Sequence, residues 1–259
     1  MKKLLCVVLW FLPVMLFAQT PFDGTWKTNM AESKLSQKPY EFSVNNGMYD
    51  CESCNPKIKN LKADGQDQPV TGQTYDTLAV QVVDANTLHV TGKKAGKPAF
   101  EQTRTASPDG KMMTIASTNY PADGSASFKS EAKFTRAGKG PAGSSAVSGS
   151  WRIQNVSEDT AGLTNTFKVS GNELSMSTPT GESWQVKFGG EESPVKGIYA
   201  NETVSVKKLG DRAVEVTYRR DGKVDSIDKL TVSSDGKTMT VVSDSKRFGR
   251  TSTFVAEKQ

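Results

Sequence analysis

Apolar and polar residues alternate at every second position over much of this chain. In the segment 204–218 the apolar positions are occupied by Val204, Val206, Val214, Val216 and Tyr218. Serine, lysine, glutamate and threonine lie between them. A period of two is typical of strands that bury one face. The same alternation recurs in residues 78–90, so the pattern predicts an all-β protein.

Short turn signals separate the predicted strands. Asp221-Gly222 and Ala95-Gly96 predict tight hairpins, and Asp109-Gly110 and Asp235-Gly236 predict a second pair of turns. No stretch of adequate length carries an apolar stripe at helical spacing. Residues Asn29 to Lys34 are compatible with one helical turn or a short 3₁₀ segment.

The chain also repeats itself. Gly24-Thr25-Trp26 returns as Gly149-Ser150-Trp151, 125 residues later, and the blocks 69–72 and 107–111 return as 194–197 and 233–237 in the same order. Blocks that recur in order at nearly constant spacing indicate a tandem duplication. We therefore expect two domains, at residues 19–137 and 148–259. Residues 138–147 are rich in Gly, Ser and Pro and are expected to be an unpacked linker.

Each repeat contains about eight or nine strand-like runs. A meander with this many strands hides its edges best by closing on itself. We predict two tandem up-and-down antiparallel β-barrels of about eight strands each. An open sandwich of two sheets, which uses the same alternation, is the alternative.

The N-terminus has the features of an export signal. Lys2 and Lys3 precede an apolar run from Leu4 to Phe17, and Ala18 offers a small residue for cleavage. We predict a signal peptide over residues 1–18 and an exported protein, periplasmic or extracellular; an uncleaved anchor is the alternative. Cleavage removes two lysines and no acid, so the net charge falls from +5 to +3. This small charge, without basic clusters interleaved with aromatics, gives no sign of nucleic-acid binding. No integral membrane span is expected after cleavage.

Two cysteines remain in the mature chain, Cys51 and Cys54. In an oxidising compartment an even pair is expected to form a disulfide. The residues around the pair are typical of strand and turn, which favours a structural bond. A redox pair or a metal site is the alternative, although a zinc site would need a second pair of ligands.

The residues of catalytic chemistry do not come together in the sequence. The chain has one histidine. This residue, His89, lies between the inward-facing Leu88 and Val90, so it is expected on the outer face of its strand. No Gly-x-Ser-x-Gly nucleophile motif is present. The acidic pairs Glu158-Asp159 and Glu191-Glu192 are predicted in loops. We therefore expect no catalytic residues, no metal and no cofactor.

The Gly-x-Trp motif opens each repeat, with Gly24 and Trp26 in the first and Gly149 and Trp151 in the second. A Gly-x-Trp at the start of a small up-and-down barrel resembles the calycins, the group of lipocalins, fatty-acid-binding proteins and avidin-like proteins. The string from Phe22 to Lys27, followed by Asn29 and Ser33-Lys34, is also similar to secreted bacterial lipocalin-like proteins of uncharacterised function. The resemblance implies a barrel that the tryptophan closes at one end.

Candidate ligand-binding residues follow from this arrangement. Trp26 and Trp151 form either an aromatic floor under a ligand or a plug of one barrel end, and the plug is favoured because buried aromatics usually contribute core area. The second repeat has a more aromatic predicted interior, which makes it the expected site. Asp228 faces inward and either orients a ligand or lies at an open barrel mouth. The full candidate set is Trp26, Trp151, Trp184, Val186, Phe188, Tyr218 and Asp228.

These observations support a functional hypothesis. We expect an exported, non-enzymatic protein that binds a small apolar or amphipathic ligand inside a barrel. The alternative is a structural or protein-interaction module whose barrels are filled by side chains, with a partner that the sequence does not identify. An enzyme on a small barrel is a third hypothesis, but it would need titratable groups that converge inside one barrel. An interior cavity of roughly 300 Å³ or more would favour ligand binding.

Overall fold

A computed structural model of the chain describes residues 20–198 and 201–259. In this part of the chain all regular elements are β-strands, which confirms the predicted all-β class. The predicted signal peptide, residues 1–18, lies outside the described residues. A search of the described residues for a helix long and apolar enough to cross a membrane finds none.

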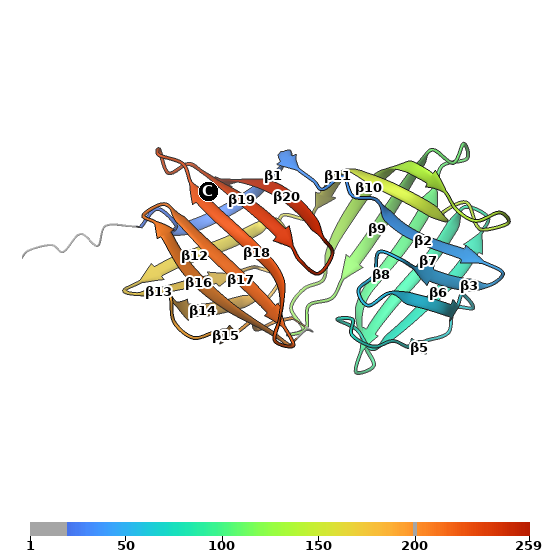
Figure 1. Ribbon diagram of the computed structural model, residues 1–259, viewed down its shortest axis with the longest axis horizontal. Helices are drawn as coiled ribbons and strands as arrows, with labels where there is room; N and C mark the ends of the chain where they lie inside the picture. Colours follow the sequence, from blue (N-terminus) through green and yellow to red (C-terminus); the bar gives the residue numbers. More distant parts are fainter. Residues whose placement is uncertain (1–19, 199–200) are drawn as a thin grey trace, which may run out of the picture.

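The strands form two antiparallel sheets of ten strands each, and each sheet curls into a nearly closed barrel (Figure 1). The first barrel consists of β2 (Tyr40–Asn45), β3 (Met48–Cys51), β4 (Ile58–Lys62), β5 (Gln68–Pro69), β6 (Thr77–Asp84), β7 (Thr87–Lys94), β8 (Lys97–Ala106), β9 (Met112–Asn119), β10 (Phe128–Lys139) and β11 (Gly149–Glu158). The second consists of β12 (Thr164–Ser170), β13 (Glu173–Ser177), β14 (Ser183–Lys187), β15 (Ser193–Pro194), β16 (Glu202–Gly210), β17 (Ala213–Arg220), β18 (Lys223–Val232), β19 (Thr238–Ser245), β20 (Arg250–Lys258) and β1 (Gly24–Lys34).

The number of strands corrects the prediction of about eight per barrel. Each barrel includes a strand of only two residues, Gln68–Pro69 in one and Ser193–Pro194 in the other. Two residues are too few to show an alternation of apolar and polar side chains, so the sequence pattern does not reveal them. Isolated bridges such as Asp64 to Gln81 and Ser183 to Lys196 then bring the ends of each sheet together.

The two repeats exchange their first strands. β1, from the first repeat, pairs with β12 and β20 of the second barrel. β11, from the second repeat, pairs with β2 and β10 of the first. Figure 1 shows the blue β1 among the orange and red strands of the second barrel. The registers match, because Gly24 lies opposite Phe167 and Gly149 opposite Phe42. The expected boundaries at 19–137 and 148–259 therefore follow the repeats and not the sheets.

The exchange also changes the role of the expected linker at 138–147. This segment connects β10 to β11, two neighbouring strands of the first barrel, and its first two residues belong to β10. Val147 is fully buried in the core and Ala146 packs against it, which corrects the expectation that the segment does not pack. The chain instead crosses between the barrels at residues 35–39 and 159–163.

The hairpin predictions are confirmed, whereas the helical option for Asn29 to Lys34 is wrong. Asp221-Gly222 and Ala95-Gly96 form tight turns with positive φ at both residues. Residues Asn29 to Lys34 continue strand β1, with an irregular register at this place. The side chain of Asn29 accepts a hydrogen bond from the backbone NH of Ala31 and its carbonyl accepts one from Ser33, so local polar bonds bend the strand without forming a helix.

Candidate functional site

The two Gly-x-Trp motifs form equivalent structures at one end of each barrel. Trp26 and Trp151 are fully buried, and each indole nitrogen donates to a backbone carbonyl four residues earlier, at 2.9 and 2.8 Å. Gly24 and Gly149 have φ of 127° and 131°, a region that favours glycine. This arrangement fits the plug interpretation, since each ring is buried in a core and each indole nitrogen is hydrogen-bonded to the backbone.

A cation covers each of these tryptophans. The guanidinium carbon of Arg136 lies 3.9 Å from the ring centroid of Trp151, and the ammonium of Lys258 lies 5.3 Å from that of Trp26. Arg136 also donates to the carbonyls of Gly110 and Ser148, which fixes the loop before β11. Neither cation could be identified from the sequence. Their strands carry several basic residues, and the alternation does not show which of them covers the tryptophan.

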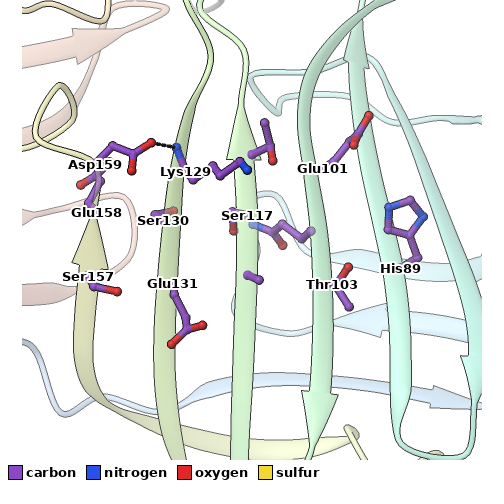
Figure 2. Close-up of a pocket in the computed structure, with 13 residues that line it drawn as sticks. His89, Glu101, Thr103, Ser117, Lys129, Ser130, Glu131, Ser157, Glu158 and Asp159 are labelled. Carbon is purple, nitrogen blue, oxygen red and sulfur yellow. Dashed lines mark hydrogen bonds between the residues drawn. The ribbon is translucent and has the colours of Figure 1, made fainter.

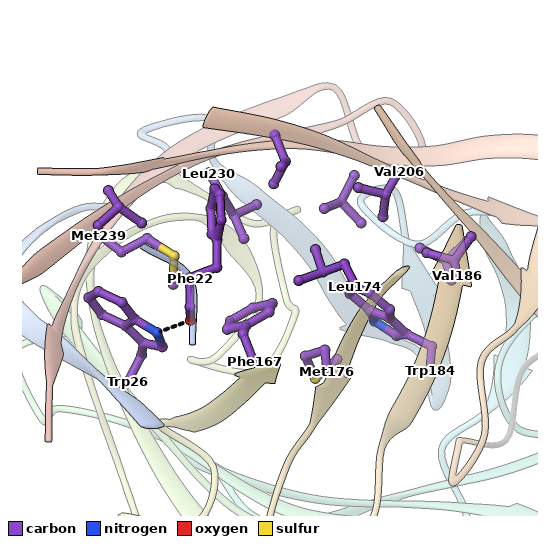
Figure 3. Close-up of a cluster of buried hydrophobic side chains, with 14 of the residues drawn as sticks. Phe22, Trp26, Phe167, Leu174, Met176, Trp184, Val186, Val206, Leu230 and Met239 are labelled. Carbon is purple, nitrogen blue, oxygen red and sulfur yellow. Dashed lines mark hydrogen bonds between the residues drawn. The ribbon is translucent and has the colours of Figure 1, made fainter. Parts of the chain in front are cut away.

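The core of the second barrel includes residues that the sequence nominated (Figure 3). Trp184 and Val186 are buried, Phe188 and Tyr218 pack against the same core, and Trp26 joins them through the exchanged strand. The indole nitrogen of Trp184 donates to the hydroxyl of Tyr218 at 3.1 Å. Trp151 belongs to the other barrel. Five of the seven candidates, Trp26, Trp184, Val186, Phe188 and Tyr218, therefore lie in or against one core.

Three carboxylates lie in this second barrel and at its opening. Asp228 faces inward with Leu230, and its carboxylate accepts a hydrogen bond from Ser243 at 2.7 Å. Burial raises the pKa of Asp228, and the bond from Ser243 opposes that shift. Burial, and then the charges of Glu202 and Asp228, raise the pKa of Glu182 to about 7. Glu182 and Glu202 also line a cavity of about 350 Å³ between the two barrels.

The first barrel contains a cavity. It has a volume of about 490 Å³ and lies against the core of this barrel. Its apolar lining includes Tyr40, Phe42, Ile115, Ala132, Phe134 and Ile153. Its polar lining includes Tyr75, Gln102, Arg104, Arg220 and Arg247. The cavity is therefore amphipathic, and it meets the size that the sequence analysis set for a ligand-binding barrel.

Arg104 is the cation of the barrel wall. It lies on β8 and faces inward, since it alternates with the buried Ala106. Its guanidinium lies 4.7 Å from the ring centroid of Phe42 and donates to Tyr49 at 3.2 Å and to Gln102 at 3.0 Å. In the second barrel, Leu230 occupies the equivalent position. The fold thus accepts an apolar side chain here, so the charge of Arg104 is not required by the barrel.

The other barrel supplies one side of this cavity. Residues 246–249 connect β19 to β20 and reach the opening of the first barrel, where Arg247 and Phe248 line the cavity. Arg247 donates to the carbonyls of Asn55 and Gly72, the latter at 2.6 Å. Arg250 stacks on Tyr40 at 3.8 Å. This β19–β20 hairpin therefore closes the first barrel with side chains from the second.

The arginines of the β19–β20 hairpin and of β17 belong to a half-buried ion network. Arg220 pairs with Glu202 and lies 3.7 Å from Asp225, and Arg247 lies 3.6 Å from the same Asp225. Burial lowers the pKa of Arg247. The Nε atom of Arg247 is buried and has no hydrogen-bond partner among the described residues. Arg247 thus brings an incompletely satisfied guanidinium to the cavity.

A second hollow, of about 540 Å³, lies on the outer face of the first barrel (Figure 2). His89 lines it, since Leu88 and Val90 on either side are buried, and this confirms the predicted outward position. Apart from Ala116, its other lining residues are polar, and they include four acids, Glu101, Glu131, Glu158 and Asp159. Burial, and then the charge of Asp159, raise the pKa of Glu158. Figure 2 shows these side chains spread over neighbouring strands.

Cys51 and Cys54 lie at disulfide-bonding distance, with an S–S separation of 2.09 Å. Cys51 ends strand β3 and Cys54 lies in the turn that follows, as the sequence context predicted. Both residues line the 490 Å³ cavity of the first barrel. In the described residues, no group of three or more His, Cys, Asp or Glu side chains is placed to hold a metal ion.

The architecture defines an all-β protein of two nearly closed antiparallel barrels that share strands. Comparison with known proteins adds no family to this description. No protein-family model, no curated protein and no solved structure gives a significant match to the chain.

Proposed function

We propose that this protein is exported, is not an enzyme, and binds a small amphipathic ligand in the cavity of its first barrel. The observation that carries the proposal is the cavity of about 490 Å³, which is lined by both apolar and polar side chains. Burial of ligand surface against the apolar side chains supplies the driving force, at about 25 cal/mol per Å². The calycin resemblance of the two Gly-x-Trp motifs supports the same function, since members of that group carry ligands inside barrels.

The proposed site differs from the one that the sequence favoured. Trp184 and Tyr218 occupy the interior of the second barrel and hydrogen-bond to each other. We therefore assign the second barrel a supporting role: it closes the first barrel through the β19–β20 hairpin. A structural or protein-interaction module, the alternative, remains a possible outcome of the test below.

A filled-cavity variant tests the proposal. Ala132 lines the cavity on β10, and Phe254 occupies the equivalent position in the second barrel. Ala132→Phe should occupy part of the cavity and weaken binding of the neutral fluorophore N-phenyl-1-naphthylamine about tenfold or more, as expected for an overfilled pocket. Ala116→Phe is the matched control, because Ala116 lies on the outer hollow.

Two results would contradict the proposal. Failure of the wild-type protein to bind the fluorophore, together with native mass spectra free of any co-purified molecule, would favour the structural alternative. Loss of binding in Ala116→Phe but not in Ala132→Phe would move the site to the outer hollow.

A further inference from the structure

The charge lining the first-barrel cavity is unbalanced. Three guanidinium groups line it, those of Arg104, Arg220 and Arg247, and among the described residues no aspartate or glutamate does. Arg220 and Arg247 are partly neutralised by Glu202 and Asp225, which lie behind them. In the described part of the chain, no carboxylate forms an ion pair with Arg104, whose hydrogen bonds go to neutral groups.

An uncompensated cation inside a barrel is costly unless something pairs with it. Arg104 is half-buried and stacks on Phe42 and Tyr49. Its counterpart Leu230 shows that the fold does not need a cation at this position. Arg104 donates to Tyr49 and Gln102, but neither neutral partner balances its charge. A guanidinium without a counter-ion, at a position where the fold accepts leucine, is available to pair with an anionic ligand.

Arg104, Arg247 and Tyr75 line the same cavity. Burial, and then the neighbouring Tyr49, raise the pKa of Tyr75 to about 12, and the charges of Arg104 and Arg247 oppose this shift. Tyr75 also packs edge-on against Phe100, at 5.1 Å between ring centroids.

We propose that the first-barrel cavity binds an anionic amphiphile, whose head group lies between Arg104 of the barrel wall and Arg247 of the β19–β20 hairpin. The head group is a carboxylate or a phosphate, the groups that guanidinium forks recognise. The apolar chain of the ligand lies against Phe134, Ile115 and Ile153. This inference rests on the proposed function, and it makes the second barrel a necessary part of the site in the first.

Calorimetric titration of the full chain with four ligands of one chain length tests the inference. These are decanoate, decyl phosphate, decanol and decyltrimethylammonium, each below its micelle concentration. We expect the two anions to bind at least about tenfold more tightly than decanol, and the ammonium most weakly, since a charge-assisted hydrogen bond is worth more than a neutral one. The stronger of the two anions identifies the head group.

Three variants locate the charge. Arg104→Leu installs the residue of the second barrel and should reduce the preference for the anions over decanol to about twofold or less. Arg247→Gln should reduce the same preference at least about threefold. Lys246→Gln is the control, because Lys246 is exposed and pairs with Asp244 outside the cavity. Thermal melting checks that each variant folds. If Arg247→Gln does not fold, Arg247→Lys is measured in its place. This variant keeps the charge but removes the guanidinium fork.

The outcomes separate the inference from the proposed function. Equal affinities for decanoate and decanol in the wild-type protein would overturn the anionic site and leave ligand binding intact. The assignment of the head group to Arg104 and Arg247 would be overturned by either of two results. One is that Arg104→Leu keeps the preference for anions. The other is that the full preference remains without the Arg247 guanidinium. Absence of binding by all four ligands would overturn both proposals.

Discussion

The two barrels have the same strand order and pairing, but their interiors differ. The first barrel encloses a cavity of about 490 Å³ that is lined by arginines. The second is packed around Trp184, and its opening is acidic, with Glu182 and Glu202. The interiors differ at several matched positions: Arg104 matches Leu230, Gln102 matches Asp228, Ile58 matches Trp184, and Ala132 matches Phe254. In our proposal the two copies of the fold therefore have different roles. The first barrel contains the ligand cavity, and the second barrel supports the first.

The largest expected effect tests whether the barrels share strands. Trp26→Ala should destabilise the second barrel by about 3–5 kcal/mol, because the large buried side chain packs there despite its place in the first repeat. Hydrogen exchange should show lost protection in β12–β20 and little change in β2–β10. Trp151→Ala is the matched variant and should give the reverse pattern. Loss of protection within the repeat that carries the substitution would mean that the strands are not exchanged.

A second variant would make the two interiors more alike. Trp184→Ile installs the residue of the first barrel and should cost about 2–4 kcal/mol, since it removes aromatic packing and leaves a cavity. It should also allow N-phenyl-1-naphthylamine to enter the second barrel. Urea unfolding and fluorophore titration measure the two effects. Trp184→Phe, which keeps an aromatic ring, should bind no additional fluorophore; a wild-type stability in Trp184→Ile would show that the second interior is not held by this residue.

The smallest expected effect uses the acidic opening of the second barrel. The pKa of Glu182 is about 7 in the folded chain against an ordinary 4.5, so the folded state binds this proton more tightly than the unfolded state. Stability should therefore decrease as the pH rises from about 4.5 to about 7, and the loss should be complete above that range. Burial is the largest cause of this shift, followed by the charges of Glu202 and Asp228.

Glu182→Gln should remove that part of the pH dependence, which thermal melting at a series of pH values would show as a shift of a few degrees. Glu191→Gln, at an exposed position, should leave the dependence as it is in the wild type. The same slope in Glu182→Gln and wild type would place the titrating group elsewhere.

The strands could be predicted from the sequence because each has one buried face. The buried Val204, Val206, Val214 and Val216 are the positions that the alternation marks as inward. The turns could be predicted because Asp221-Gly222 needs a backbone that few other residues adopt. The strands of two residues could not be predicted, since they are held by their neighbours and not by a pattern of their own.

The strand exchange could not be predicted, for a physical reason. Gly24-Thr25-Trp26 and Gly149-Ser150-Trp151 have the same glycine and tryptophan in the same register, and Thr25 is matched by the similar Ser150. The motif therefore does not distinguish one barrel from the other. The cavity was also missed, because Arg104 interrupts an apolar alternation and resembles an ordinary surface residue until it is compared with Leu230 in the other repeat.

The loop of residues 140–148 has a consequence for how the chain can be divided. It is a hairpin connection within the first barrel, between β10 and β11. A polypeptide cut there gives two fragments, each of which lacks one strand and carries the strand that the other lacks. Such fragments would have to complement each other to fold, as the halves of a reciprocally swapped heterodimer do. The gene can therefore be split at this loop, but neither product would form a complete barrel without the other.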